Sequence, residues 1–201
     1  MLGGASMFVE AKGDGRICPL VDLGFRNDTT QADHTQIPEQ NTILNAVARG
    51  RFRSKIDLGD AYFQNRVHPD NEKYNTIKTS FRGFTSQVMM QGDINALGTF
   101  VRTREDLFHD ELGKNIWVYI DDSFVLSDTF QEHVKNATHT CSKLQNAGYF
   151  ANPKKSAFFA TKLDMLGHMM NDDGIHPAPD KIRTIMDWTG PENQKELQRF
   201  N

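Results

Sequence analysis

The stretch Asn115-Ile-Trp-Val-Tyr-Ile-Asp-Asp-Ser-Phe-Val-Leu-Ser127 places two adjacent aspartates, Asp121 and Asp122, between two apolar runs. Each run has about five residues, a typical strand length, so the pattern predicts a hairpin that turns at the aspartate pair. Two neighbouring carboxylates in an otherwise apolar segment repel each other, and a multivalent cation bound against them relieves this repulsion. The stretch therefore predicts a metal-binding β-hairpin.

The composition of the 201-residue chain is that of a globular protein with a substantial core. No window approaches the roughly 18 apolar residues of a membrane helix, and the first residues lack the basic and apolar regions of a signal peptide. Cys18 and Cys141 are too few for a disulfide framework, which favours a reducing compartment. The net charge of −3 argues against a nucleic-acid partner, unless basic side chains gather along one track beside an acidic metal site.

A third acid, Asp57, ends a segment that alternates basic and other residues. Because side chains alternate between the two faces of a strand, the odd-numbered residues of the expected strand 51–58 share one face, and Ile56 and Leu58 point into the core. With the preceding arginine, the basic ladder consists of Arg49, Arg51, Arg53 and Lys55. A basic ladder that ends in an acid suits a metal site approached by phosphates, and a solvated strand face remains the alternative.

The rest of the chain predicts strands interspersed with helices. Strands are expected at 17–23, 64–68, 75–81, 84–90, 155–161 and 163–169, and a loop at 27–36. Helices are expected from Pro38 to Gly50, at 94–112, from a cap at Asp128 or Thr129 to Gly148, at 180–188 and from Glu192 onward. The helix before Gly148 is expected to bury Phe130, Val134, Ala137, Cys141 and Leu144. This order predicts an α+β fold in which helices back one face of an antiparallel sheet.

Five sequence blocks, taken in order, resemble the reverse transcriptases of gypsy-type long-terminal-repeat retrotransposons, with lentiviral enzymes as more distant relatives. The blocks are Lys55–Gln64, Gln91–Phe100, Tyr119–Asp122, Gly148–Lys155 and Leu166–His168. The likeness runs from about residue 8 to about residue 200. Several spaced blocks in the right order are more specific than any one of them.

The resemblance implies a polymerase palm, which is a ferredoxin-like antiparallel sheet backed by helices, together with part of the fingers. Residues 1–54 would form partial fingers, and residues 55–170 the palm with the catalytic site and a fingers-like insertion around 64–90. Residues 171–201 would form a truncated connector from palm to thumb. By the standards of the family, a complete thumb and a ribonuclease H segment are not expected in this chain.

The resemblance also implies the site residues. Asp57, Asp121 and Asp122 would be catalytic and bind Mg²⁺, with Mn²⁺ as a substitute. The residues implied in nucleotide binding are Asp60, Ala61, Tyr62, Gln91, Lys154 and Lys155, where Tyr62 would be a steric gate under the sugar and a lysine would assist at the pyrophosphate. Leu166, Gly167 and His168 would form the primer grip. The implied activity is RNA-directed DNA polymerisation, with a primed RNA or DNA template and deoxynucleotides as partners.

Several residues depart from the family pattern. The family usually has an apolar or aromatic residue where Asp93 stands, proline at Leu97, arginine at Gly24 and an aliphatic residue at Ser123. Arg16, the nearest candidate for a triphosphate-binding arginine of the fingers, lies about two residues early. Asp93 would repel a triphosphate.

Two alternatives therefore stay open. One is a catalytically inactive palm, decayed or domesticated, that binds nucleic acid or a protein. The other is a phosphodiesterase or nucleotide cyclase with a two-metal palm, which the order of the blocks disfavours. The expected location is an intracellular retroelement particle, cytoplasmic or nuclear, without membrane association. The sequence leaves the oligomeric state open and allows self-association through exposed apolar surface.

Overall fold

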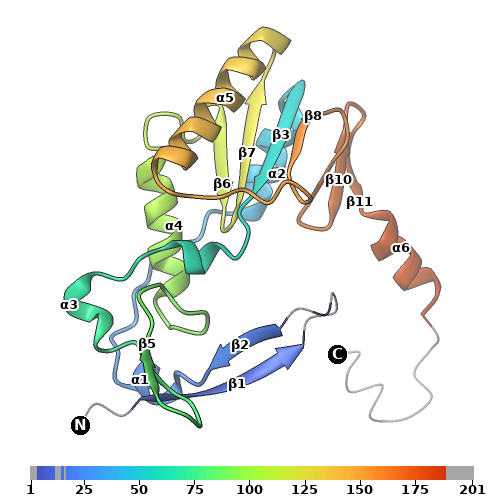
Figure 1. Ribbon diagram of the computed structural model, residues 1–201. Helices are drawn as coiled ribbons and strands as arrows, with labels where there is room; N and C mark the ends of the chain where they lie inside the picture. Colours follow the sequence, from blue (N-terminus) through green and yellow to red (C-terminus); the bar gives the residue numbers. More distant parts are fainter. Residues whose placement is uncertain (1–3, 12–14, 16, 189–201) are drawn as a thin grey trace.

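The computed structural model describes residues 4–11, 15 and 17–188 of the chain. The expected helix from Glu192 and the candidate Arg16 lie outside the described residues. Within them, a four-stranded antiparallel sheet with its helices forms one part of the molecule and is called the larger sheet (Figure 1). A second four-stranded sheet, near the N-terminus, forms the other part and is called the smaller sheet. None of the described helices is long and apolar enough to cross a membrane.

The larger sheet is antiparallel and has the strand order β6-β7-β3-β8. Its strands are β3 (Phe52–Asp57), β6 (Ile116–Tyr119), β7 (Asp122–Ser127) and β8 (Ala157–Ala160). The predicted hairpin is present as β6 and β7, with Tyr119 opposite Asp122. The turn lies one residue earlier than expected, at Ile120 and Asp121, because Ile120 adopts the left-handed conformation (φ 51°) and Asp122 already belongs to β7.

Helices α4 (Ala96–Leu107) and α5 (Phe130–Asn146) cover one face of this sheet. Their shared core includes Ile56, Phe100, Phe108, Val125 and Leu144, all at most 3% exposed. As predicted, the Thr129 side chain caps α5 by accepting a hydrogen bond from the Glu132 amide at 3.3 Å.

The buried stripe of α5 differs from the expected one. The buried residues are His133, Ala137, Thr140 and Leu144, whereas Phe130, Val134 and Cys141 are exposed. Polar His133 can be buried because its ring nitrogens have partners on the sheet: Nε2 lies 2.7 Å from the Ser54 hydroxyl and Nδ1 lies 3.2 Å from the Ser127 hydroxyl. Apolar periodicity alone could not detect a stripe that contains a satisfied histidine.

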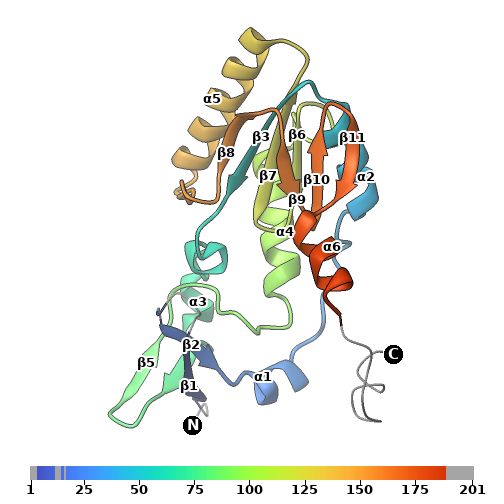
Figure 2. The same cartoon turned by 90° about the vertical axis from the view of Figure 1, so that its right-hand side faces the viewer.

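The opposite face of the sheet packs against α2 (Gln40–Arg49) and a three-stranded sheet of order β11-β10-β9. Figure 2 shows α5 and the β10–β11 hairpin on opposite sides of the larger sheet. The apolar stripe of α2 is buried as predicted, at Ile43, Leu44 and Val47. The strand expected at 163–169 is instead two strands, β9 (Leu163–Met165) and β10 (His168–Asn171), because Leu166 and Gly167 turn the chain with positive φ. Strand β11 (Gly174–Pro177) and helix α6 (Pro179–Met186) follow.

The smaller sheet joins two segments that are distant in sequence. Its order is β2-β1-β4-β5, with β1 (Ala5–Ala11), β2 (Ile17–Val21), β4 (Thr76–Lys78) and β5 (Gly83–Thr85). The short helices α1 (Gly24–Asp28), η1 (Ala61–Gln64) and α3 (Pro69–Glu72) lie in the connecting segments, and η1 packs Ala61 and Tyr62 into the core beneath α4. Helix α1 begins just before the loop expected at 27–36 and includes its first residues. The strand expected at 64–68 is reduced to an isolated bridge between Arg66 and Val88, because η1 includes Gln64 and α3 begins at Pro69.

Candidate active site

The three predicted metal-binding aspartates lie on neighbouring strands. Asp57 is the last residue of β3 and stands opposite Asp122, the first residue of β7. Asp121 occupies the adjoining turn, and its carbonyl accepts a hydrogen bond from the Leu58 amide at 3.3 Å. Asp57 and Asp122 are buried, whereas Asp121 is exposed. The fold therefore gathers acids from two distant sequence blocks at one end of the sheet.

Burial and local charges act on these acids in opposite directions. Burial raises the pKa of Asp57, Lys155 lowers that pKa, and Asp121 raises it. Burial also raises the pKa of Asp122, while the hydrogen bond and charge of Lys55 lower it. Both buried carboxyls thus hold their negative charge less readily than an exposed aspartate, so a bound cation would stabilise the ionised forms.

Of the predicted basic ladder, Arg49 and Arg51 are exposed, whereas Arg53 and Lys55 have partners within the fold. Arg53 is 2% exposed, and its guanidinium donates to the carbonyls of Val47 and Ala48 at the end of α2 and to Asp172 at 3.2 Å. Lys55 pairs with Asp122 across the sheet, Nζ to Oδ2, at 2.8 Å. Neither the solvated face nor the phosphate track describes these two residues, because both are committed to groups within the fold.

The carboxylate oxygens of the three aspartates suit a divalent cation, although the side chains do not converge on one point. Asp122 Oδ1 is buried and has no hydrogen-bond partner among the described residues, and hard cations prefer such carboxylate oxygens. Across the described part of the chain, no three acidic, histidine or cysteine side chains converge as a ready-made metal site. Asp57, Asp121 and Asp122 could hold an ion if Asp121 turns inward.

A buried arginine lies behind the hairpin, on the helix side of the sheet. Arg104 of α4 is 0% exposed and donates through Nη2 to the Ser123 hydroxyl. Its guanidinium lies 5.5 to 5.7 Å from the ring centroids of Phe100, Phe108 and Tyr149. Its Nε and Nη1 atoms are buried and have no hydrogen-bond partner in the part of the chain described. Ser123, a departure from the family pattern, is therefore the polar anchor of Arg104.

The residues that follow Asp57 in the first block are those expected to bind the nucleotide. Asp60 adopts a left-handed conformation (φ 47°) directly before η1, which contains buried Ala61 and half-buried Tyr62. The Tyr62 ring packs against Phe100, with centroids 5.5 Å apart. Burial and the charge of Asp121 both raise the pKa of Tyr62, which places the phenol near the acids.

The segment around Lys154 and Lys155 is hydrogen-bonded to the backbone of Asp57. The Asn152 amide donates to the Asp57 carbonyl at 2.8 Å, and the Asp57 amide donates to the Ser156 hydroxyl at 3.1 Å. The Gln64 side chain forms two hydrogen bonds with the backbone of Phe150: it donates to the carbonyl at 3.0 Å and accepts from the amide at 2.7 Å. Lys154 and Lys155 are both exposed, and the charge of Lys155 acts on Asp57. Of the two lysines, Lys155 is therefore the one whose charge stabilises the ionised form of Asp57.

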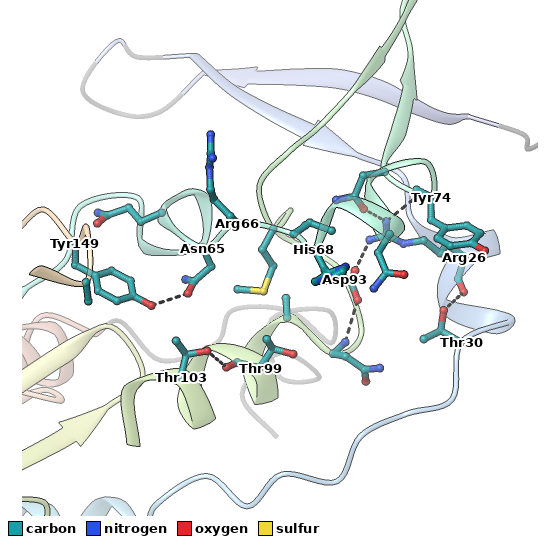
Figure 3. A pocket seen from close by; sticks show the side chains of 18 of the residues that line it. Arg26, Thr30, Asn65, Arg66, His68, Tyr74, Asp93, Thr99, Thr103 and Tyr149 are labelled. Atoms are coloured by element: carbon teal, nitrogen blue, oxygen red, sulfur yellow. Dashed lines mark hydrogen bonds and ion pairs between the residues drawn. The ribbon is translucent and has the colours of Figure 1, made fainter. Parts of the chain in front are cut away.

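Asp93 does not present a free charge, because it forms an ion pair with Arg26 of α1. Arg26 also donates to Asn75, and these residues line a cavity of about 910 Å³ between α1, η1, α3 and α4 (Figure 3). The expectation that Asp93 repels a triphosphate therefore overlooked its partner. Gln91 is exposed in the turn that precedes α4.

The expected primer grip forms the turn between β9 and β10. Leu166 (φ 52°) and Gly167 (φ 74°) occupy the turn, and the His168 ring lies 3.2 Å from the Leu166 carbonyl. Helix α6 packs against this turn, since the Ala178 amide donates to the Gly167 carbonyl at 3.2 Å. In both overall views the turn lies at the same end of the larger sheet as the β6–β7 turn (Figures 1 and 2).

A family model described as "Reverse transcriptase (RNA-dependent DNA polymerase)" matches residues 19–170. The chain belongs to the reverse transcriptase family. This confirms the resemblance deduced from the five blocks and the palm fold expected from it. Reverse transcriptases generally use divalent metal ions, which agrees with an acidic site at the β6–β7 hairpin.

Retrotransposon polyproteins are among the relatives of this reverse transcriptase chain. It is 29% identical over 181 residues to the retrovirus-related Pol polyprotein from transposon opus of Drosophila melanogaster, and 23% identical over 181 residues to that from transposon gypsy. These matches cover 90% of the chain and 18% of each polyprotein. The chain thus spans about a fifth of the length of these relatives.

Solved structures of foamy viral protease-reverse transcriptase share the fold. One, in complex with double-stranded DNA, has a TM-score of 0.88 and 25% identity over 98% of this chain and 34% of that one. Another, in complex with an RNA/DNA hybrid, has a TM-score of 0.85 and 24% identity over 98% of this chain and 26% of that one. The second likeness is evidence for the fold alone.

Three residues that shape the site of this reverse transcriptase were not predicted in their roles: Lys55, Gln64 and Arg104. Lys55 was predicted to lie on a phosphate track or on a solvated strand face, and its closeness in sequence to Asp57 was the available signal. Gln64 closes the first block, but its link to Phe150 spans 86 positions and has no sequence signature. Arg104 occupies an inward position of the predicted helix, where a charged residue in an apolar stripe is itself a signal.

Proposed function

We propose that this chain is the palm, with part of the fingers, of an RNA-directed DNA polymerase from a retrotransposon polyprotein. The observation that supports it most is the pairing of Asp57 with Asp122 across β3 and β7, with Asp121 in the adjoining turn. In a member of the reverse transcriptase family, this arrangement of acids suits nucleotidyl transfer to a primer 3′-hydroxyl. The chain would act on a primed RNA or DNA template with deoxynucleoside triphosphates.

Asp57 and Asp121 would hold Mg²⁺, or Mn²⁺ in its place, while Asp122 lies close by and ligates less directly. Such ions, when bound, would supply charge stabilisation to the attacking and leaving oxygens. The chain's own contribution is placement: the antiparallel pairing of β3 and β7 fixes the two acid-bearing strands, and the β6–β7 turn presents Asp121 beside them.

The nucleotide would lie along η1. The backbone amides of Asp60 and Ala61 would meet the triphosphate, and Tyr62, braced by Phe100, would exclude a 2′-hydroxyl by size. Gln91 would line the nucleotide pocket. Of the two lysines, Lys155 is the better candidate for the pyrophosphate because its charge already acts on Asp57, with Lys154 adding positive potential.

The primer would meet Leu166, Gly167 and His168, whose turn shares an end of the palm with the acids. The solved relative in complex with double-stranded DNA supports nucleic acid as the partner. We assign residues 1–54 to partial fingers, 55–170 to the palm with its insertion at 64–90, and 171–201 to the connector. The pairing of β1 with β4 agrees with placing both segments in the fingers. The proposed location is an intracellular retroelement particle.

An inactive palm that binds nucleic acid or protein is the second candidate. Two buried donor atoms of Arg104 have no hydrogen-bond partner among the described residues, a costly arrangement that a decayed copy would tolerate more readily than a selected enzyme. The same observation applies to a domesticated palm in which polymerisation is no longer under selection.

Primer extension separates the two candidates. A labelled oligo-dT primer on poly-rA is extended with dTTP and Mg²⁺ by the wild type, Asp121→Asn and the surface control Asp110→Asn. We expect extension by the wild type and Asp110→Asn, and none by Asp121→Asn. Folded wild-type protein that adds no nucleotide would rule out the enzyme, and equal extension by Asp121→Asn would rule out the assigned site.

A further inference from the structure

Lys55 is a fixed cation inside the acidic site. Its side chain lies on the same face of β3 as Asp57 and reaches Asp122 on the neighbouring strand, with Nζ 2.8 Å from Oδ2. The two side chains are only 19% and 12% exposed. A charge pair so little exposed to water is screened less than a surface pair, so Lys55 offsets the charge of Asp122 at close range.

The charge of Asp122 is therefore already compensated within the protein. One Asp122 oxygen binds Lys55, and the other is buried without a hydrogen-bond partner in the described chain. By contrast, Lys55, Lys155 and Asp121 act on Asp57 through their charges, with no ion pair to Asp57 among the described residues, and Asp121 is exposed. Asp57 and Asp121 remain the acids with freedom to ligate an ion.

We infer that Lys55 is a positioning residue that holds Asp122 off the divalent ion and keeps the affinity of the empty site for metal low. This inference rests on the proposed function, since it concerns the same acids. Mg²⁺ in phosphoryl-transfer sites is typically bound by one or two carboxylates together with substrate phosphates. With Lys55 in place, Asp57 and Asp121 supply those carboxylates, and tight metal binding waits for the nucleotide.

Mn²⁺ binding without nucleotide tests this role. Free Mn²⁺ is measured by electron paramagnetic resonance in titrations of the whole chain as wild type, Lys55→Met, Lys55→Gln, Asp122→Asn and Lys55→Met/Asp122→Asn. Removing a monovalent charge several ångströms from a divalent ion should tighten binding about tenfold even in a water-like dielectric. We expect this gain in Lys55→Met and Lys55→Gln, and weaker binding in Asp122→Asn, where Lys55 is left uncompensated.

The double variant is the decisive measurement. Because it removes both members of a neutral pair, it should bind Mn²⁺ with an affinity within about twofold of the wild type if Asp122 does not ligate the ion. Lys55→Arg, which keeps the charge, should also match the wild type. Circular dichroism melts establish folding, and Lys55→Gln, which can still donate a hydrogen bond to Asp122, serves if Lys55→Met does not fold.

Two results would overturn the inference. One is a failure of both neutral Lys55 variants to bind Mn²⁺ more tightly, and the other is a double variant that binds as weakly as Asp57→Asn. Asp57→Asn separates this failure from failure of the proposed function. If Asp57→Asn loses Mn²⁺ while the Lys55 variants gain nothing, only the role of Lys55 is wrong. If Asp57→Asn binds as the wild type does, the metal site itself is wrong.

Discussion

Replacing the buried Arg104 and its anchor Ser123 by apolar residues should stabilise the protein. Burial lowers the pKa of the Arg104 guanidinium to about 10. One pKa unit corresponds to about 1.4 kcal/mol, so a depression of roughly two to three units costs the charged form about 3 kcal/mol. At pH 7 Arg104 is protonated in both the folded and the unfolded chain, and the whole cost is present because it is relieved only above the folded pKa.

Part of this cost is offset by the contacts of Arg104. The hydrogen bond to Ser123 and the rings of Phe100, Phe108 and Tyr149 favour the charged side chain. Replacing a buried charge by well-packed apolar residues is often neutral or stabilising by about 1–4 kcal/mol. For Arg104→Met/Ser123→Val we expect a gain of about 2 kcal/mol, which corresponds to roughly 4–8 °C in melting temperature for a chain of this size. Substituting both residues avoids leaving the buried Ser123 hydroxyl without its partner.

Urea unfolding at pH 7 measures this gain, with Arg104→Ala/Ser123→Val as the matched control. The control removes the same charge but leaves a cavity, so it should be less stable than the methionine variant by about 2 kcal/mol or more. A lower unfolding midpoint for Arg104→Met/Ser123→Val than for the wild type, at an unchanged m-value, would show that Arg104 contributes net stability. The assessment of its buried charge would then be wrong.

Three further outcomes follow from contacts within the fold. Tyr62→Ala should lower the discrimination against ribonucleotides at least about tenfold in kcat/KM, while Tyr62→Phe keeps it; an unchanged sugar preference in Tyr62→Ala would contradict the gate. Burial lowers the pKa of His133, so as the pH falls below about 6.5 the unfolded chain takes up a proton at this residue before the folded chain does. The stability that depends on neutral His133 is therefore fully present above that pH and is lost as the pH falls below it. His133→Gln should lose less stability than the wild type between pH 7 and pH 5 in urea unfolding, and equal losses would exclude His133 as the cause. Arg53→Met removes the donor to two α2 carbonyls and Asp172 and should cost about 3 kcal/mol, against under about 0.5 kcal/mol for the exposed Arg51→Met; similar melting temperatures for the two would refute the capping role.

Local patterns in the sequence were enough to predict the elements that make the palm. The α2 stripe of Ile43, Leu44 and Val47, the cap at Thr129 and the β6–β7 hairpin follow from periodicity, capping chemistry and apolar runs. The block order predicted the family, which the match over residues 19–170 confirms. These features could be predicted because each is encoded within about one element of sequence.

Features that depend on partners far along the chain could not be predicted in this way. The basic ladder of β3 was assigned to solvent or phosphates, yet Arg53 binds α2 and Asp172, and Lys55 binds Asp122. Asp93 similarly has its charge paired by Arg26, 67 positions away. Alternation shows which face a residue occupies and leaves open what covers that face. The roles proposed for all of the site residues stay predictions.

The pairing of β1 with β4 has a consequence for how the molecule folds. Ala5 pairs in parallel with Ile77, so the smaller sheet closes only after the intervening chain, which includes α2 and β3, has been synthesised. Parallel pairing over such a separation is slow because the loop must close before the contact gains free energy. Until then the β1–β2 hairpin presents an open strand edge, the kind of edge that pairs with other chains. The first residues of this polypeptide should therefore be the part most prone to aggregation during folding.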